Sequence, residues 1–254
     1  MDEVEVVTVA DPDLDEPAFV EGLPGVGHVG KLAAEHLIEE FDGELVRRIH
    51  SEHFPPQVTV DESSVTSLAS AEVYAVEAEG RDLLVLVGDF QAGDAVGQYR
   101  VAEAFLDVAE SFGVTEIIAL GGAPTGDVVE EYTVVGAVTA DDRKAEFEAA
   151  GVEFRESEPA GGIVGTSGLL LGLSPRRELP AACLMGETSG YMVDPLSAQA
   201  LLEVLQTHLG FEVDFGKLED RAEELQAVIE EFQASQGGGG MEQAPSEEDL
   251  RYIG

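Results

Sequence analysis

The sequence predicts an α/β fold, a three-layer sandwich in which helices cover both faces of a mixed, mainly parallel sheet. Short apolar runs alternate along the chain with longer segments whose apolar residues recur at helical spacing, which is typical of parallel strands joined by crossover helices. A hairpin expected around Gly80 adds antiparallel pairing to that sheet. A chain of 254 residues is long enough to bury one such core and to carry appendages.

Each expected element is supported by its own pattern. The strands are brief apolar runs bounded by turn residues, whereas the helices show an apolar stripe such as Val101, Phe105, Val108 and Phe112. The expected strands cover residues 4–9, 18–23, 45–49, 73–78, 83–87, 117–120, 132–138 and 181–185. The expected helices cover residues 32–41, 96–112, 141–150 (capped by Asp141), 161–173 and 196–209.

The C-terminal part of the chain changes character. We expect residues 1–210 to form the α/β domain, residues 211–235 to form an amphipathic helix, and residues 236–254 to form a flexible, glycine-rich tail. The helix carries a heptad seam that covers only about two heptads, too few to hold a coiled coil alone. It therefore either packs on the domain or joins copies of the chain. The seam consists of Leu218, Ala222, Leu225, Ile229 and Phe232.

The charge balance is strongly acidic, with 52 Asp and Glu residues against 13 Lys and Arg residues and a formal net charge of −39. Such a surface repels itself at low ionic strength, and molar salt removes most of that penalty by shortening the Debye length to about 3 Å. We therefore expect a chain adapted to a salt-rich cytoplasm, as in halophilic organisms. An acidic face for a basic partner would give the same count and stays open.

Composition also disfavours several partners and compartments. Nucleic acid is not expected as a partner, because the sequence has no basic stripe to neutralise phosphates. The lone Cys183 cannot form an internal disulfide and suits a reducing compartment. Residues 1–5 lack the features of a signal peptide, and no uncharged apolar run reaches the ~18 residues of a membrane span. We expect a soluble, cytoplasmic protein that does not enter membranes.

The loop after the last expected strand is the first candidate site. Residues 181–185 lead into the polar turn Glu187-Thr188-Ser189, and ligands of open α/β sheets bind just past the carboxyl ends of strands. Asp194 is expected as the N-cap of the next helix, with Pro195 at its first position. Glu187 could be a buried carboxylate with a raised pKa or a structural acid. No histidine is obviously placed as a base for Ser189, so acyl transfer is not supported.

A second candidate is the glycine loop Gly25-x-Gly27-x-x-Gly30, which matches a dinucleotide-binding fingerprint and, with Lys31, nearly matches a P-loop. The hydroxyl that a P-loop would offer to Mg²⁺ is replaced by Leu32. We favour a tight strand-to-helix turn whose glycines permit close packing. His50 and His53 have no third ligand nearby in sequence, so we expect neither a metal nor a cofactor.

Five motifs stand along the chain, at residues 22–31, 88–91, 121–126, 134–137 and 186–195. Their marked positions are Gly25, Gly27, Gly30, Gln91, Gly121, Gly122, Gly186, Glu187, Thr188, Ser189, Gly190, Tyr191, Asp194 and Pro195. Taken in order, these motifs resemble the PAC2 family, the archaeal relatives of eukaryotic proteasome assembly chaperones. The resemblance covers about residues 4–209 and implies a nucleoside-phosphorylase-like α/β sandwich, self-association, and ATP-independent binding to proteasome α subunits.

The end of the chain supplies a further candidate contact. Some proteasome-binding relatives end in a hydrophobic–Tyr–any-residue motif, and here Tyr252 stands one place too early, before Ile253 and Gly254. An acidic tail that ends in Leu250, Tyr252, Ile253 and Gly254 is still typical of a tethered recognition peptide. A ragged terminus is the alternative for these residues.

The leading interpretation is an ATP-independent proteasome assembly chaperone-like protein that forms a homo-oligomer and binds proteasome α subunits. The alternative is a small-molecule or nucleotide-binding enzyme of ATP-grasp-like or phosphorylase-like type. Its pocket would be formed by residues 25–30, Gln91 and residues 187–189.

Overall fold

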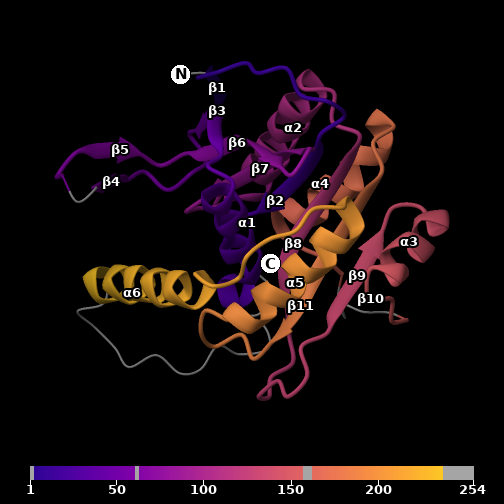
Figure 1. Ribbon diagram of the computed structural model, residues 1–254. Helices are drawn as coiled ribbons and strands as arrows, with labels where there is room; N and C mark the ends of the chain where they lie inside the picture. The colour runs from indigo at the N-terminus through magenta and orange to yellow at the C-terminus, as the bar shows by residue number, and fades with distance from the viewer. Residues whose placement is uncertain (1–2, 61–62, 157–161, 237–254) are drawn as a thin grey trace.

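A computed structural model describes residues 3–60, 63–156 and 162–236 of the chain (Figure 1). Within these residues, nine strands form one mixed sheet in the order β1-β3-β6-β7-β2-β8-β11-β9-β10. The strands are β1 (Val4–Thr8), β2 (Ala18–Gly22), β3 (Glu44–Ser51), β6 (Ala71–Ala78), β7 (Arg81–Gly88), β8 (Glu116–Pro124), β9 (Val134–Val138), β10 (Val152–Glu153) and β11 (Ala181–Thr188). A separate two-stranded sheet consists of β4 (Val58–Val60) and β5 (Thr66–Leu68).

Helices cover both faces of the nine-stranded sheet, so the predicted three-layer α/β architecture is confirmed. On one face α1 packs against α5, and on the other α2 packs against α4 (Figure 1). The short α3 lies beside α5, and α6 lies against α1 and α5. The helices are α1 (Val29–Glu40), α2 (Ala95–Ser111), α3 (Lys144–Ala149), α4 (Gly165–Leu173), α5 (Pro195–Leu209) and α6 (Leu218–Gln236).

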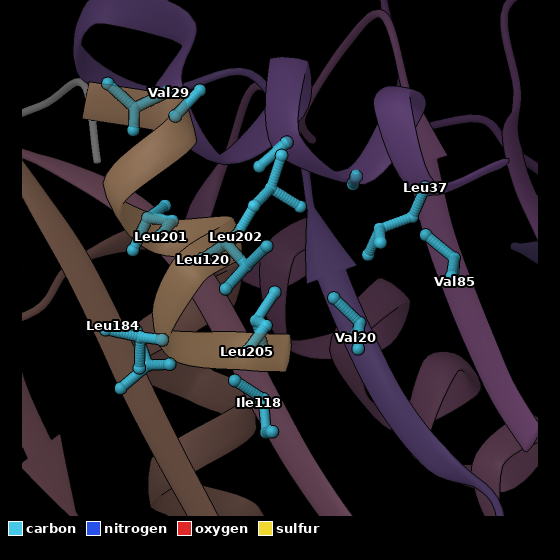
Figure 2. Packing of buried hydrophobic residues seen from close by; sticks show 14 of the residues in the cluster. Val20, Val29, Leu37, Val85, Ile118, Leu120, Leu184, Leu201, Leu202 and Leu205 are labelled. Atoms are coloured by element: carbon cyan, nitrogen blue, oxygen red, sulfur yellow. The ribbon is translucent and has the colours of Figure 1, made fainter. Parts of the chain in front are cut away.

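Each face of the sheet has its own apolar core. Figure 2 shows the first core, in which Leu201, Leu202 and Leu205 of α5 approach the sheet residues Ile118 and Leu184. Phe19, Phe105 and other fully buried side chains fill the second core, between the sheet and α2 and α4. At roughly 2 kcal/mol for each large buried apolar side chain, these two layers supply the main driving force for folding.

Parallel pairing dominates the centre of the sheet, where β7, β2, β8 and β11 run side by side. Antiparallel pairing joins β1, β3, β6 and β7 on one flank and joins β11 to β9 on the other. The predicted hairpin around Gly80 is the β6–β7 pair. The four central parallel strands therefore end at one edge of the sheet, which we call the carboxyl edge.

Some elements differ from the sequence expectations. The β4–β5 hairpin was not predicted, because three-residue strands rich in Thr and Ser carry almost no periodicity. The helix expected from residue 161 begins at Gly165. Asp141 was wrongly predicted to be a helix cap. It begins a 3₁₀ turn, Asp141–Arg143, and its carboxylate lies 2.7 Å from Lys144 Nζ.

The amphipathic helix α6 packs on the body at its N-terminal end. Leu218 and Ala222 are buried in the first core, and Leu225 packs against that core. The rest of the heptad seam lies beyond the residues whose side chains are described. Among the described helices, none combines the length and the apolar character needed to span a membrane.

Candidate functional site

The carboxyl edge gathers most of the motif residues predicted as a site. The glycine loop follows β2, Gln91 follows β7, Gly121 and Gly122 lie near the end of β8, and residues 186–188 end β11. The N-termini of α1 and α5 lie at the same edge, because these helices follow β2 and β11. The N-terminus of α4 also lies there, because the other end of α4 leads to the start of β11. The fold therefore brings together motifs that lie far apart in the sequence.

The glycines of this edge allow chain segments to touch. A Cβ at Gly30 would lie 2.3 Å from the carbonyl oxygen of Leu120, and one at Gly122 would lie 2.2 Å from that of Val26. Gly27 has a positive φ of 61°, and a Cβ there would lie 2.9 Å from Thr188 Oγ1. The glycine loop packs directly on β8 and β11, as the tight-turn interpretation predicted. These close approaches give Gly27, Gly30 and Gly122 a packing role in the structure.

We call residues 188–194 the motif loop. A side-chain hydrogen bond between Thr188 and Asp194, which we call the clasp, joins the two ends of this loop. The Thr188 hydroxyl donates to Asp194 Oδ2 at 2.7 Å, and the Asp194 amide donates to the Gly27 carbonyl at 3.1 Å. Asp194 Oδ1 accepts from the Ser197 amide at 3.1 Å, and Pro195 occupies the first turn of α5. The predicted N-cap is confirmed, and the same side chain also fixes the motif loop.

Gln91 ties three segments together. Its Nε2 donates to the Pro24 carbonyl at 2.8 Å, and its Oε1 accepts from the amide and the hydroxyl of Thr166, both at 3.3 Å. The amide side chain thereby links the end of β7 to the glycine loop and to the start of α4. With both its donor and its acceptor engaged in this way, Gln91 acts as an internal brace of the carboxyl edge.

The buried acid of this edge is Glu21, not Glu187. Glu21 is the single charged residue of β2 and is buried against α4, where it accepts from Ser167 Oγ at 2.9 Å and from the Leu23 amide at 3.1 Å. Burial raises the pKa of Glu21 to about 7, and the two hydrogen bonds offset only part of that rise. One acid within an otherwise apolar strand was the signal that could have revealed it.

Glu187 is partly exposed and ion-paired. Its side chain is 18 % exposed, and its Oε1 lies 2.6 Å from Arg155 Nη1. Ser189 follows it in the turn before Gly190, whose φ is 80°. The geometry therefore indicates a structural role for Glu187, which is ion-paired with Arg155 at the carboxyl edge.

Other reactive side chains lie apart from this edge or are engaged. Cys183 is buried in β11, and that burial raises the pKa of its thiol far above the usual range. His53 Nδ1 lies 2.9 Å from Asp94 Oδ2, so the pair caps and braces α2. Within residues 3–60, 63–156 and 162–236, no group of three or more His, Cys, Asp or Glu side chains is arranged to hold a metal ion.

The outer face of the motif loop is apolar. Tyr191 and Met192 are each 66 % exposed, and Leu196 beside them is 48 % exposed. We call these three residues the motif-loop surface. Tyrosine and methionine are enriched at protein interfaces, because they bury large areas at low entropic cost. At this edge the polar side chains form hydrogen bonds within the protein, whereas the motif-loop surface is exposed and apolar. Such a surface is suited to contact with another protein. The tail residues Leu250, Tyr252, Ile253 and Gly254 lie outside the described residues.

Comparisons with known proteins agree with this arrangement. A sequence model of the PAC2 family matches residues 19–233. An uncharacterised protein of Methanocaldococcus jannaschii is 38% identical over 244 residues, which are 95% of this chain and 93% of that protein.

Solved structures of PAC2-type proteins share the fold. Pyrococcus furiosus PbaB, an archaeal proteasome activator, is 37% identical with a TM-score of 0.83, covering 92% of this chain and 100% of PbaB. Pyrococcus furiosus PbaA, an archaeal homolog of proteasome-assembly chaperone, is 26% identical with a TM-score of 0.73, covering 92% of each chain. The closer likeness to nucleoside phosphorylases stays a prediction. On the family match and the archaeal relatives together, this chain belongs to the PAC2 family.

Proposed function

We propose that this chain is an ATP-independent, proteasome assembly chaperone-like protein that binds proteasome α subunits. The observation that carries the proposal is the similarity to PbaB, an archaeal proteasome activator, at 37% identity over the whole of PbaB. The ATP-independent part of the proposal rests on the membership of the PAC2 family.

The motif-loop surface is the body's proposed contact with α subunits. Tyr191 and Met192 of the motif loop and Leu196 in the first turn of α5 are exposed, and the Thr188–Asp194 clasp joins the two ends of that loop. A preorganised aromatic and thioether surface loses little entropy on binding, so a small patch can act as a hot spot.

The tail is the proposed second contact. Residues 250–254 would bind an α subunit while the body is docked, and tethering raises their effective concentration without a larger interface on the body. We also propose that the body forms a homo-oligomer, so that several tails act on one ring of subunits.

Capture of isolated α subunits at molar salt tests the proposal. The full-length chain should capture them, and a chain ending at Gln236 should bind about tenfold more weakly, a loss of about 1.4 kcal/mol. Tyr191→Ser/Met192→Ser should reduce capture further. Val96→Ser/Tyr99→Ser is the matched control, because it changes an exposed apolar pair near the start of α2, on the opposite layer.

The outcomes separate the parts of the proposal. Failure of the full-length chain to capture α subunits would overturn it. Equal affinity of the full-length and shortened chains would remove the tail from the mechanism, and equal losses in the two serine pairs would remove the motif-loop surface.

A further inference from the structure

The nine-stranded sheet has two outer strands, and they differ in how well their open edges are protected. At one end β10 consists of only two residues, whereas at the other end β1 consists of five and pairs with β3 alone among the described strands (Figure 1). β1 contains neither Lys nor Pro, and its register with β3 has no bulge. Short strands, Lys, Pro and bulges are the features that keep edge strands from pairing with other chains. The edge of β1 is therefore open to a further strand.

The backbone groups of β1 that face the open edge follow from its ladder with β3. The Val9 amide donates to the Val46 carbonyl at 2.9 Å, and the Glu52 amide donates to the Glu3 carbonyl at 3.3 Å. Hydrogen-bonded residues alternate along an antiparallel pair, so residues 3, 5, 7 and 9 bond to β3. The amide and carbonyl groups of the residues between them point toward the open edge. These residues are Val4, Val6 and Thr8.

The side chains of β1 are largely apolar and are exposed on both faces of the strand. Val6 is 41 % exposed, and Val7, which points to the opposite face, is 38 % exposed. Glu5 is the one charged residue of the strand. Because β-branched residues favour strand pairing, a strand added at this edge would cover the valines and the open backbone groups together.

The surroundings of β1 suit the approach of a second copy of the chain. Three of the 13 Lys and Arg residues of this chain, whose net charge is −39, lie around the strand, and each is ion-paired with an acidic residue at 2.6–3.1 Å. Neutralised carboxylates lower the repulsion between two copies of an acidic chain. The pairs are Arg47 with Asp11, Arg48 with Glu72 and Arg100 with Glu3.

We propose that two copies of the chain associate by antiparallel pairing of their β1 strands across a two-fold axis at Val6. In this register Val6 faces Val6 of the second copy and Val4 faces its Thr8, so the open amide and carbonyl groups of both strands are all hydrogen-bonded. Glu5 faces Val7 of the second copy, so no carboxylate faces another. Centring the pairing on Glu5 would oppose two carboxylates, and centring it on Val7 would leave the Val4 backbone groups unbonded.

This inference rests on the homo-oligomer of the proposed function, for which it names an interface, and it needs no contact with α subunits. A two-fold contact uses the same surface of both copies and closes on itself. The β1 pairing therefore gives a dimer in which the two sheets are continuous.

Sedimentation equilibrium of the full-length chain at molar KCl tests the pairing, with Val6→Pro as the main variant. The Val6 amide points away from β3, so proline at this position removes a hydrogen bond to the second copy and none within the chain. We expect the dimer dissociation constant to rise about tenfold. Val6→Thr is the matched control, because it keeps the amide and a β-branched side chain, and it should dimerise like the natural chain.

Disulfide cross-linking tests the register and does not depend on the proline variant. Glu5→Cys/Val7→Cys should give a disulfide-linked dimer, because these positions face each other across the interface as a non-hydrogen-bonded pair. Each single cysteine variant should cross-link poorly, since identical positions lie more than about 7 Å apart in this register. The natural Cys183 is buried and does not compete.

The outcomes separate this inference from the rest of the proposed function. A chain that stays monomeric would overturn both the β1 pairing and the homo-oligomer. Unchanged association of Val6→Pro, equal losses in Val6→Pro and Val6→Thr, or no disulfide-linked dimer would overturn the β1 pairing alone, and cross-linking decides if Val6→Pro fails to fold. Loss of association in a chain ending at Gln236 would also overturn it, because the tail would then make the contact. Failure to capture α subunits would leave the β1 pairing unaffected.

Discussion

At the scale of single residues, Glu21 stands out because its carboxyl group is buried inside the folded chain. Its partners, Ser167 and the Leu23 amide, anchor the start of α4 to the central strand β2. A carboxyl group that is neutral when buried and charged when exposed makes folding stability depend on pH.

The sign of that dependence follows from the pKa of Glu21, which burial raises from 4.5 to about 7. The folded chain holds this proton more tightly than the unfolded chain, so the contribution is full below pH 4.5 and is lost as the pH rises to about 7. Glu21→Gln should abolish this loss and be more stable than the natural chain at pH 8 by up to about 3 kcal/mol. Denaturant unfolding across this pH range measures the difference.

The same change at the exposed Glu77 is the matched control for the loss of one negative charge. If Glu21→Gln and the natural chain kept a constant difference in unfolding free energy from pH 4.5 to pH 8, Glu21 would not carry this linkage.

Gly30 is one of the residues at which the packing leaves no room for a side chain. Gly30→Ala places a Cβ 2.3 Å from the Leu120 carbonyl oxygen, so α1 has to move away from β8. We expect a loss of about 2 kcal/mol in unfolding free energy, despite a gain of about 1 kcal/mol in helix propensity. Gly25→Ala is the control, since nothing lies within 4 Å of its added Cβ and its φ of −153° is extended. Equal stability of the two variants would contradict the packing role.

The residues of the carboxyl edge were predictable where local chemistry alone decides their role. Asp194 and Pro195 form a helix start that depends on adjacent residues, and the glycine loop forms the turn that its spacing favours. The sequence left open whether Glu187 is a buried or a structural acid and did not single out Glu21, because the burial of Glu21 depends on α4, a helix far away in the sequence. The single acid within the otherwise apolar strand β2 was a local signal of this burial, but its contact with α4 has none.

At the scale of elements, α5 and the motif loop depend on one side chain. Asp194→Ala removes the cap of α5 and leaves the Thr188 hydroxyl without its acceptor. We expect a loss of about 1–2 kcal/mol in unfolding free energy. Asp194→Asn keeps an oxygen for the Ser197 amide and should recover most of that loss. An alanine variant as stable as the natural chain would show that the clasp is dispensable.

Element prediction succeeded for the long apolar strands and the amphipathic helices and failed for short, polar elements. Helices cover both faces of the strands β2, β7, β8 and β11, so most residues of these strands are apolar. Such strands are recognisable in the sequence as short continuous apolar runs. The β4–β5 hairpin has an uncovered apolar face of only three residues, too few for periodicity to show. Its position beside α1 depends on the whole fold.

At the scale of the whole molecule, a formal net charge of −39 opposes folding through self-repulsion. Unfolding free energy should therefore rise with KCl concentration, most steeply as the Debye length falls to about 3 Å near 1 M. Thermal unfolding in a KCl series measures this rise. A melting temperature that stayed constant or fell with added KCl would contradict the expected adaptation to salt.

Association with proteasome α subunits is the central claim, and sedimentation velocity of the full-length chain mixed with isolated α subunits at molar KCl tests it most directly. The account predicts a complex that sediments faster than either component, and slower sedimentation when the tail and the motif-loop surface are both altered. Two independent boundaries, unchanged from those of the separate proteins, would contradict it.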